Sequence, residues 1–157
     1  MFQLIPAPLH RVGLRLAHAL RRRWWRIAQV KLHGCRVLAF DDEGRVLLIR
    51  HSYGSGAWMM PGGGLARNED PVAGALREMA EEVGCTLTGA RLFAVEDEPL
   101  YGTVNRVHLV TGRIVGTPQE DGREVIALEL FQPDALPERL SPALSARMAD
   151  WIAMAQA

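Results

Sequence analysis

One stretch of this 157-residue chain, residues 63–85, constrains the fold more than any other. Asp70 followed by Pro71 is a strong helix start, because aspartate can cap the first free N–H groups and proline suits the first helical position. Gly84 offers the left-handed residue that commonly ends a helix. The sequence therefore predicts a helix over residues 71–83.

The predicted helix has two different faces. Apolar side chains recur at steps of four, three and four residues and form one stripe: Val72, Leu76, Met79 and Val83. Glutamates spaced i, i+3 and i+4 cluster on another face: Glu78, Glu81 and Glu82. The stripe is expected to pack on a sheet while the carboxylates face outward into a cleft. Such carboxylates repel one another, but Mg²⁺ takes oxygen ligands and bridges to phosphates.

A glycine-rich turn, Pro61-Gly62-Gly63-Gly64, comes shortly before this helix. Glycines let the main chain approach a ligand closely, and such a turn can offer carbonyls or amides to a metal or a phosphate. An ordinary solvated acidic helix would not need this turn. The combination indicates a magnesium-dependent site that acts on phosphoanhydrides.

The full pattern has fixed positions over 23 residues. It reads Gly63-x5-Glu69-x7-Arg77-Glu78-Met79-x-Glu81-Glu82-x-Gly84-Cys85. This resembles the signature of the Nudix (MutT-like) hydrolases, with every fixed position matched and with Met79 and Cys85 where a bulky aliphatic residue is commoner. The resemblance implies an α/β fold, an α/β/α sandwich with a mixed β-sheet between helices.

The resemblance also implies a reaction and a cofactor. Nudix enzymes hydrolyse a nucleoside diphosphate linked to another moiety. Mg²⁺, for which Mn²⁺ is an expected substitute, neutralises the phosphates, orients them and lowers the pKa of the attacking water. The implied metal ligands are the side chains of Glu78, Glu81 and Glu82 and the main-chain carbonyl of Gly63. Gly62 and Gly63 are also expected to contact the substrate.

Two more residues of the pattern are expected to keep the site in shape. The resemblance implies that Arg77 pairs with a carboxylate, favoured to be Glu69, and so holds the loop against the helix. An ordinary i, i+4 ion pair between Arg77 and Glu81 can coexist with that role.

The pattern does not fix the general base, because some Nudix enzymes use a glutamate of the signature and others an acid from a distant loop. The chain offers six such acids outside the signature: Glu96, Asp97, Glu98, Glu120, Asp121 and Glu124. We favour Glu124, because it begins the strand that ends near Phe131, where related sequences often place a glutamate upstream of an aromatic residue. For each acid, surface charge is the alternative interpretation.

Three residues upstream of the glycine-rich turn could also take part. Arg50 is placed to contact a phosphate, and Tyr53 to stack on a base. His51 is expected to be an ordinary, partly exposed histidine at a strand end.

Residues 32–157 are predicted to form one Nudix domain, consistent with a hydrophobic content of 48%. Apolar, β-branched runs predict strands over residues 36–40, 45–51, 87–95, 104–115 and 124–131, with a hairpin turn at 41–44. Ser141 is expected to cap a last helix. The apolar face of that helix would be Leu144, Met148, Trp151 and Ile152.

Residues 1–31 form a separate basic segment with seven arginines or lysines and no acid. Residues 9–30 predict an amphipathic helix that packs on this domain or on a homodimer mate. Contact with an anionic membrane or a nucleic-acid backbone is the less favoured alternative. No disulfide framework or membrane-spanning apolar run is present, so a cytoplasmic location is expected.

The sequence does not distinguish among several classes of substrate. Nucleoside triphosphates, ADP-ribose and dinucleoside polyphosphates all fit, and the downstream cues Pro99 and Tyr101 point to different subfamilies. A non-catalytic sensor of a nucleotide metabolite is an alternative, although such domains commonly lose glutamates that this chain keeps. Hydrolysis at an RNA 5′ end is another alternative, with residues 1–31 contacting the backbone.

Overall fold

The computed structural model describes residues 13, 17, 32–100 and 103–157. The predicted helix over residues 9–30 lies outside the described residues except at two positions, so the separate segment 1–31 stays a prediction. The described elements are β1 (Leu32–Phe40), β2 (Val46–His51), α2 (Pro71–Val83), β3 (Thr86–Leu100), β4 (Thr103–Val115), β5 (Val125–Phe131) and α3 (Pro142–Gln156).

The five strands form one mixed sheet in the order β3-β4-β1-β2-β5. The central β1–β4 pair is parallel, and the other neighbours are antiparallel. The predicted hairpin turn between β1 and β2 is confirmed. The carboxylate of Asp41 accepts hydrogen bonds from the N–H groups of Glu43 and Arg45, and Gly44 has a φ of 76°.

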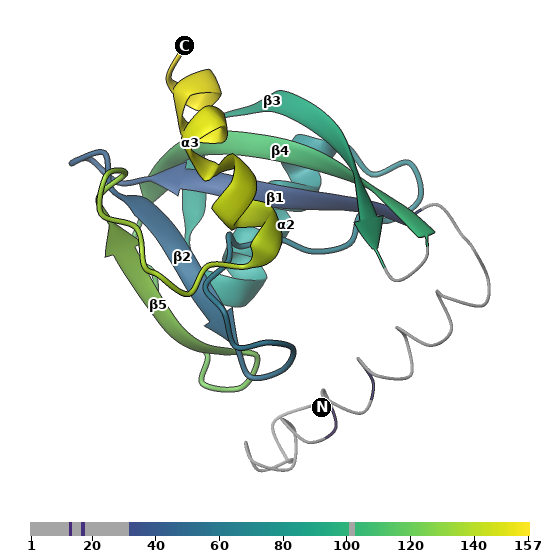
Figure 1. Ribbon diagram of the computed structural model, residues 1–157, viewed down its shortest axis with the longest axis horizontal. Coiled ribbons are helices and arrows are strands. Elements are labelled where there is room, and N and C mark those ends of the chain that lie inside the picture. Colours follow the sequence, from purple (N-terminus) through teal and green to yellow (C-terminus); the bar gives the residue numbers. More distant parts are fainter. Residues whose placement is uncertain (1–12, 14–16, 18–31, 101–102) are drawn as a thin grey trace.

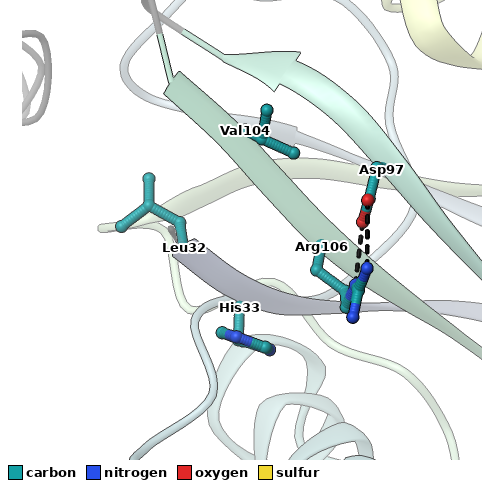
Figure 2. A pocket seen from close by; sticks show the side chains of 5 residues that line it. All are labelled: Leu32, His33, Asp97, Val104 and Arg106. Atoms are coloured by element: carbon teal, nitrogen blue, oxygen red, sulfur yellow. Dashed lines mark hydrogen bonds and ion pairs between the residues drawn. The ribbon is translucent and has the colours of Figure 1, made fainter. Parts of the chain in front are cut away.

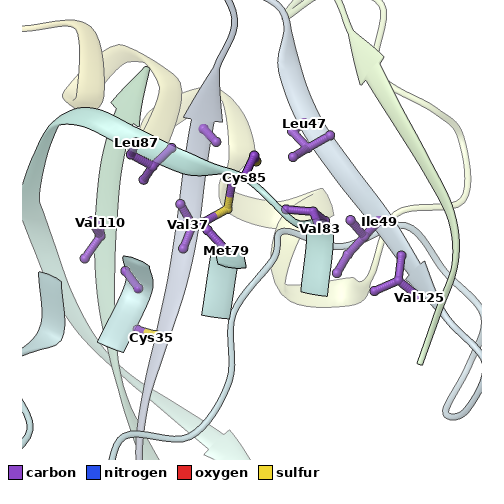
Figure 3. Packing of buried hydrophobic residues seen from close by; sticks show 12 residues of the cluster. Cys35, Val37, Leu47, Ile49, Met79, Val83, Cys85, Leu87, Val110 and Val125 are labelled. Carbon is purple, nitrogen blue, oxygen red and sulfur yellow. The ribbon is translucent and has the colours of Figure 1, made fainter. Parts of the chain in front are cut away.

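Each face of the sheet is covered by one helix (Figure 1). Alternate side chains of a strand point to opposite faces, so β1 sends Val37 toward α2 and Leu38 toward α3. Figure 3 shows the cluster on the α2 side, where Met79 and Val83 of the helix are fully buried. The predicted apolar stripe and the predicted mixed sheet between helices are both confirmed.

Helix α2 begins and ends where the sequence predicts, and α3 begins where the sequence predicts. The Asp70 carboxylate accepts hydrogen bonds from the N–H groups of Val72 and Ala73, at 3.0 and 2.9 Å, and Gly84 ends α2 with a φ of 66°. Ser141 is the N-cap of α3, although its side chain makes no capping hydrogen bond. The predicted apolar face of α3 is buried at all four positions: Leu144, Met148, Trp151 and Ile152. No helix among the described residues has the length and apolar character needed to span a bilayer.

Two strands are longer than predicted. β1 starts at Leu32 instead of residue 36, because the register with β4 continues to the Leu32–Asn105 pair. β3 runs to Leu100 instead of residue 95, and it pairs with β4 to the end. Residues 96–98 are charged and therefore did not indicate a strand. Charged side chains are tolerated in β3 because one side of this strand is an open edge of the sheet.

Candidate active site

The glycine-rich turn runs beside β1 and is hydrogen-bonded to it. The N–H of Cys35 donates to the carbonyl of Gly63 at 2.9 Å, and the N–H of Val37 donates to the carbonyl of Pro61 at 2.8 Å. Gly62 has a φ of 146°, and a Cβ at this position would lie 2.2 Å from the carbonyl oxygen of Cys35. Only glycine therefore fits at residue 62, and the turn is held at a fixed distance from the sheet.

Glu82 points into the molecule and not outward as predicted. It is only 7% exposed. One carboxylate oxygen lies 2.8 Å from Nε2 of His51, and the other accepts the N–H of Gly62 at 2.8 Å. Because both oxygens have partners, the carboxylate is fixed in orientation between β2 and the glycine-rich turn. The prediction that all three glutamates face outward is therefore wrong for Glu82.

His51 is buried, with 7% of its surface exposed, so the expectation of a partly exposed histidine is also wrong. Its ring stacks on that of Tyr53, with centroids 4.8 Å apart and an interplanar angle of 11°. The Tyr53 hydroxyl donates to Oε1 of Glu124 at 2.6 Å. In the structure, the predicted base-stacking residue Tyr53 thus stacks on a histidine and orients an acid.

Glu124 lies directly before β5 and reaches the same place. The carboxylate of Asp121 accepts the N–H groups of Arg123, Glu124 and Val125, which shapes the turn. The N–H of Ser52 donates to the carbonyl of Glu124 at 2.8 Å. One ligand atom from each of three residues lies within 4.8 Å of the others: His51, Glu82 and Glu124. The structure therefore brings the favoured acid outside the signature beside a glutamate of the signature.

Arg77 joins the loop before α2 to the helix itself. Its guanidinium donates to both carboxylate oxygens of Glu69, at 2.9 and 3.1 Å, and to the carbonyl of Gly64 at 3.1 Å. The predicted pairing with Glu69 and the i, i+4 pairing with Glu81, at 3.3 Å, are both present. The hydrogen bond from Arg77 is the main reason that the pKa of Glu69 is lowered.

Glu78 and Glu81 occupy different environments on the same helix. Glu78 is half-buried beside the glycine-rich turn, and a Cβ on Gly63 would meet its carboxylate at 2.5 Å. Burial raises the pKa of Glu78, and the hydrogen bond from Arg77 at 2.7 Å opposes part of that rise. The Glu81 side chain is 60% exposed. The three glutamates therefore run from buried to exposed along one edge of α2.

The other candidate bases are engaged elsewhere or exposed. Each acid of the β3 run pairs with an arginine: Glu96 with Arg147, Asp97 with Arg106 and Glu98 with Arg36. Asp121 is used in its turn, and Glu120 is exposed. Of the six acids, Glu124 is the one whose carboxylate the structure places within reach of Glu82.

Arg50 does not join this cluster. Its guanidinium lies 5.5 Å from the centre of the Trp58 ring, which packs on the α3 side of the sheet. The buried Nε of Arg50 has no hydrogen-bond partner. The structure thus separates Arg50 from the glutamates that the sequence grouped with it.

A shallow cavity of about 160 Å³ lies at the start of β1 and β4 (Figure 2). Its lining consists of Leu32, His33, Asp97, Val104 and Arg106. Asp97 and Arg106 form an ion pair across it, at 2.8 Å. Asp97, one of the six candidate acids, is in this lining, but its carboxylate is paired with Arg106 and lies apart from the signature glutamates, so the carboxylate cluster is the better candidate for chemistry.

A mixed sheet between two helices, with clustered glutamates beside a glycine-rich turn, defines a class of metal-assisted hydrolases of phosphorus-containing anhydrides. The sequence model of the protein family described as NUDIX domain matches residues 31–153 of this chain. The chain belongs to the Nudix family.

Relatives and solved structures agree with this membership. The MutT-like protein of Streptomyces ambofaciens is 30% identical over 109 residues, which cover 69% of each chain. The RNA pyrophosphohydrolase of Saccharophagus degradans is 44% identical over 48 residues, which cover 31% of this chain and only 28% of that protein. The MutT NUDIX hydrolase from Burkholderia pseudomallei superposes with a TM-score of 0.68 at 29% identity, covering 76% of this chain and 95% of that one.

His51 is the site residue that sequence reasoning missed. Its position at the end of an apolar strand predicted only an ordinary surface histidine. The available signal was the aromatic residue two positions on, Tyr53, which lies in the bend after β2 and stacks on the His51 ring. It identifies His51 as a site residue only when the partners Glu82 and Glu124, which are distant in the sequence, are known.

Proposed function

We propose that this chain is a Mg²⁺-dependent hydrolase that cleaves a phosphoanhydride of a nucleoside diphosphate linked to another moiety. One observation carries the proposal: every fixed residue of the signature is present, and the fold brings its buried glutamate beside an acid from a distant turn. Small nucleotide-type molecules are the proposed substrates. A homodimer, and nucleic-acid or membrane contact through residues 1–31, stay predictions.

The residues present suit a hard divalent cation. Glu82, Glu78 and Glu81 supply carboxylate oxygens along one edge of α2, and the carbonyl of Gly63, which accepts one N–H from β1, retains a second lone pair. A bound Mg²⁺ supplies charge neutralisation for the substrate's phosphates. Mn²⁺ is the proposed substitute, because it also accepts oxygen ligands.

The surrounding residues keep these carboxylates in place. Arg77 ties Glu69 and the carbonyl of Gly64 to α2, and the N–H of Gly62 fixes one oxygen of Glu82. Preorganised groups of this kind need not reorient during the reaction, which is a major source of rate enhancement.

Relatives support three substrate types for testing. The RNA pyrophosphohydrolase relative supports an RNA pyrophosphate, and membership of the Nudix family supports the nucleoside triphosphates expected from the signature. The diphosphoinositol polyphosphate phosphohydrolase 3-alpha of Homo sapiens, 34% identical over 84 residues that cover 51% of that protein, supports a diphosphate on a non-nucleotide carrier. All three contain a phosphoanhydride bond.

Product-resolved hydrolysis of a substrate panel tests the proposal. The panel contains nucleoside triphosphates, ADP-ribose, dinucleoside polyphosphates, nucleotide sugars, 5′-triphosphate RNA and a diphosphoinositol phosphate, each with Mg²⁺. We expect cleavage of at least one member at a phosphoanhydride. Tight binding of a member without cleavage of any would instead establish the non-catalytic sensor.

Glu124→Gln is expected to lower turnover by about a hundredfold, because general acid–base or electrostatic participation by a positioned carboxylate has this size. The glutamine can still accept the hydrogen bond from Tyr53, so unfolding is not expected. The matched control is Glu120→Gln, which changes an exposed acid of the preceding loop. Equal turnover in the two variants would remove Glu124 from the site.

A further inference from the structure

His51 is a buried histidine outside the signature, and it lies close to two carboxylates that are 42 residues apart in the sequence, Glu82 and Glu124. Nε2 of His51 is 2.8 Å from Glu82, and its ligand atom is within 4.8 Å of one on Glu124. Within residues 32–100 and 103–157, no arginine or lysine forms an ion pair with Glu82 or Glu124. Arg77, the nearest basic residue of the signature, contacts other carboxylates. Within these described residues, the negative charge of this trio is therefore not balanced by an arginine or lysine side chain.

We propose that His51, Glu82 and Glu124 together bind one divalent transition-metal ion, with His51 as a nitrogen ligand. The inference rests on the proposed function and deepens it, since Glu82 is shared with the site described above. A neutral imidazole and two carboxylates carry two negative charges, which a divalent cation neutralises. Imidazole is a common ligand of Mn²⁺, Co²⁺ and Zn²⁺, whereas Mg²⁺ prefers oxygen ligands alone.

The distances already approach those of a coordination shell. Cation–ligand bonds of about 2.1 Å at a right angle place a nitrogen and an oxygen about 3.0 Å apart. The observed separation of His51 Nε2 and Glu82 Oε1 is 2.8 Å. A cation can therefore replace the hydrogen bond between them with only a small movement, provided that the imidazole proton resides on Nδ1.

Neighbouring groups hold the three ligands in orientation. The Tyr53 ring stacks on His51 and its hydroxyl fixes Glu124, while the N–H of Gly62 fixes Glu82. Outer contacts of this kind are the usual way in which proteins orient metal ligands. One residue, Tyr53, orients two of the three ligands at once. Under this inference the carboxylate of Glu124 serves the cation, and the base role predicted for it from the sequence falls to another group.

Mn²⁺ added to the full-length chain provides the test, because pulsed electron paramagnetic resonance detects a nitrogen nucleus bound directly to Mn²⁺. We expect a nitrogen coupling in the wild-type protein, its loss in His51→Gln, and its retention in His33→Gln, a control at an exposed histidine. The dissociation constant of Mn²⁺ is expected to rise at least about tenfold in His51→Gln and to stay unchanged in the control. Absence of the coupling, its persistence in His51→Gln, or failure of Mn²⁺ to bind would each overturn the inference.

A second measurement does not depend on the folding of a variant. In wild-type protein with ¹⁵N-labelled histidine, Zn²⁺ is expected to shift the Nε2 resonance of His51, identified by its contact with Tyr53, more than that of any of the other four histidines. Equal small shifts at all five histidines would contradict nitrogen ligation. Hydrolysis with Mg²⁺ is followed in the same preparations. Activity without nitrogen ligation would refute only the metal inference, whereas nitrogen ligation without activity would refute only the proposed enzyme.

Discussion

Replacing Glu82 with glutamine is expected to lower hydrolysis by about a hundredfold or more while the fold is retained. The loss is the size expected when a major electrostatic contribution is removed from an active site. Glu82 is the most buried glutamate of the signature, and each of its oxygens has a partner. Glutamine has the same shape: its amide oxygen can accept the N–H of Gly62, and its amide nitrogen can donate to His51. The substitution therefore removes the negative charge of Glu82 and keeps the packing around its side chain.

The effect of Glu82→Gln is measured as the steady-state rate with saturating Mg²⁺, together with thermal unfolding of both proteins. Glu138→Gln, at an exposed position near the start of α3, is the matched control and is expected to be fully active. Unchanged turnover in Glu82→Gln would show that this carboxylate holds no essential cation. A large fall in unfolding temperature would show that the residue is mainly structural.

Gly62→Ala is expected to produce the largest loss of stability, about 3 kcal/mol or more in the free energy of unfolding. The φ of 146° at Gly62 is one that residues with a Cβ rarely adopt. The added Cβ would also lie 2.2 Å from the carbonyl oxygen of Cys35 and 2.9 Å from the Cα of Arg36. Both contacts are with main chain inside the sheet, which cannot move aside as a flexible side chain can.

Chemical denaturation of Gly62→Ala and Gly64→Ala measures this effect. Gly64 belongs to the same turn, but a Cβ there meets nothing within 4 Å, and its φ lies outside the left-handed region. Its substitution is therefore expected to change stability by no more than about 0.5 kcal/mol. Similar denaturation midpoints for the two variants would show that the turn does not dock rigidly on β1.

The helices and much of the signature could be predicted from local rules. Asp70, Pro71 and Gly84 act through contacts within a few residues, so the bounds of α2 follow from the sequence alone. The pairing of Arg77 with Glu69, which the resemblance to the Nudix signature implied, joins residues only eight positions apart. Interactions between residues of the same helical turn or the same loop can be predicted from the local sequence, because both partners lie within it.

The long-range contacts of the site could not be predicted in the same way. His51 meets Glu82 across 31 residues, and Tyr53 meets Glu124 across 71. Their proximity depends on the antiparallel pairing of β2 with β5, with its irregularity between Arg50 and His51. Alternation along β2 places His51 on the α2 side, as it does Leu47 and Ile49, and Arg50 on the α3 side. Strand alternation does not reveal which distant residues meet His51, because that depends on how the strands pair and in which register.

The measurement that tests the central claim most directly is hydrolysis of the cleaved panel member before and after removal of divalent cations. The wild-type protein is assayed with Mg²⁺, then with an excess of chelator, and then with Mg²⁺ restored. If the glutamates of α2 hold a cation, product formation is expected to stop with chelator and to recover with Mg²⁺. The Glu82→Gln variant is expected to show neither the loss nor the recovery. Product formation that continues at the full rate in chelator would contradict the assignment of these glutamates as cation ligands.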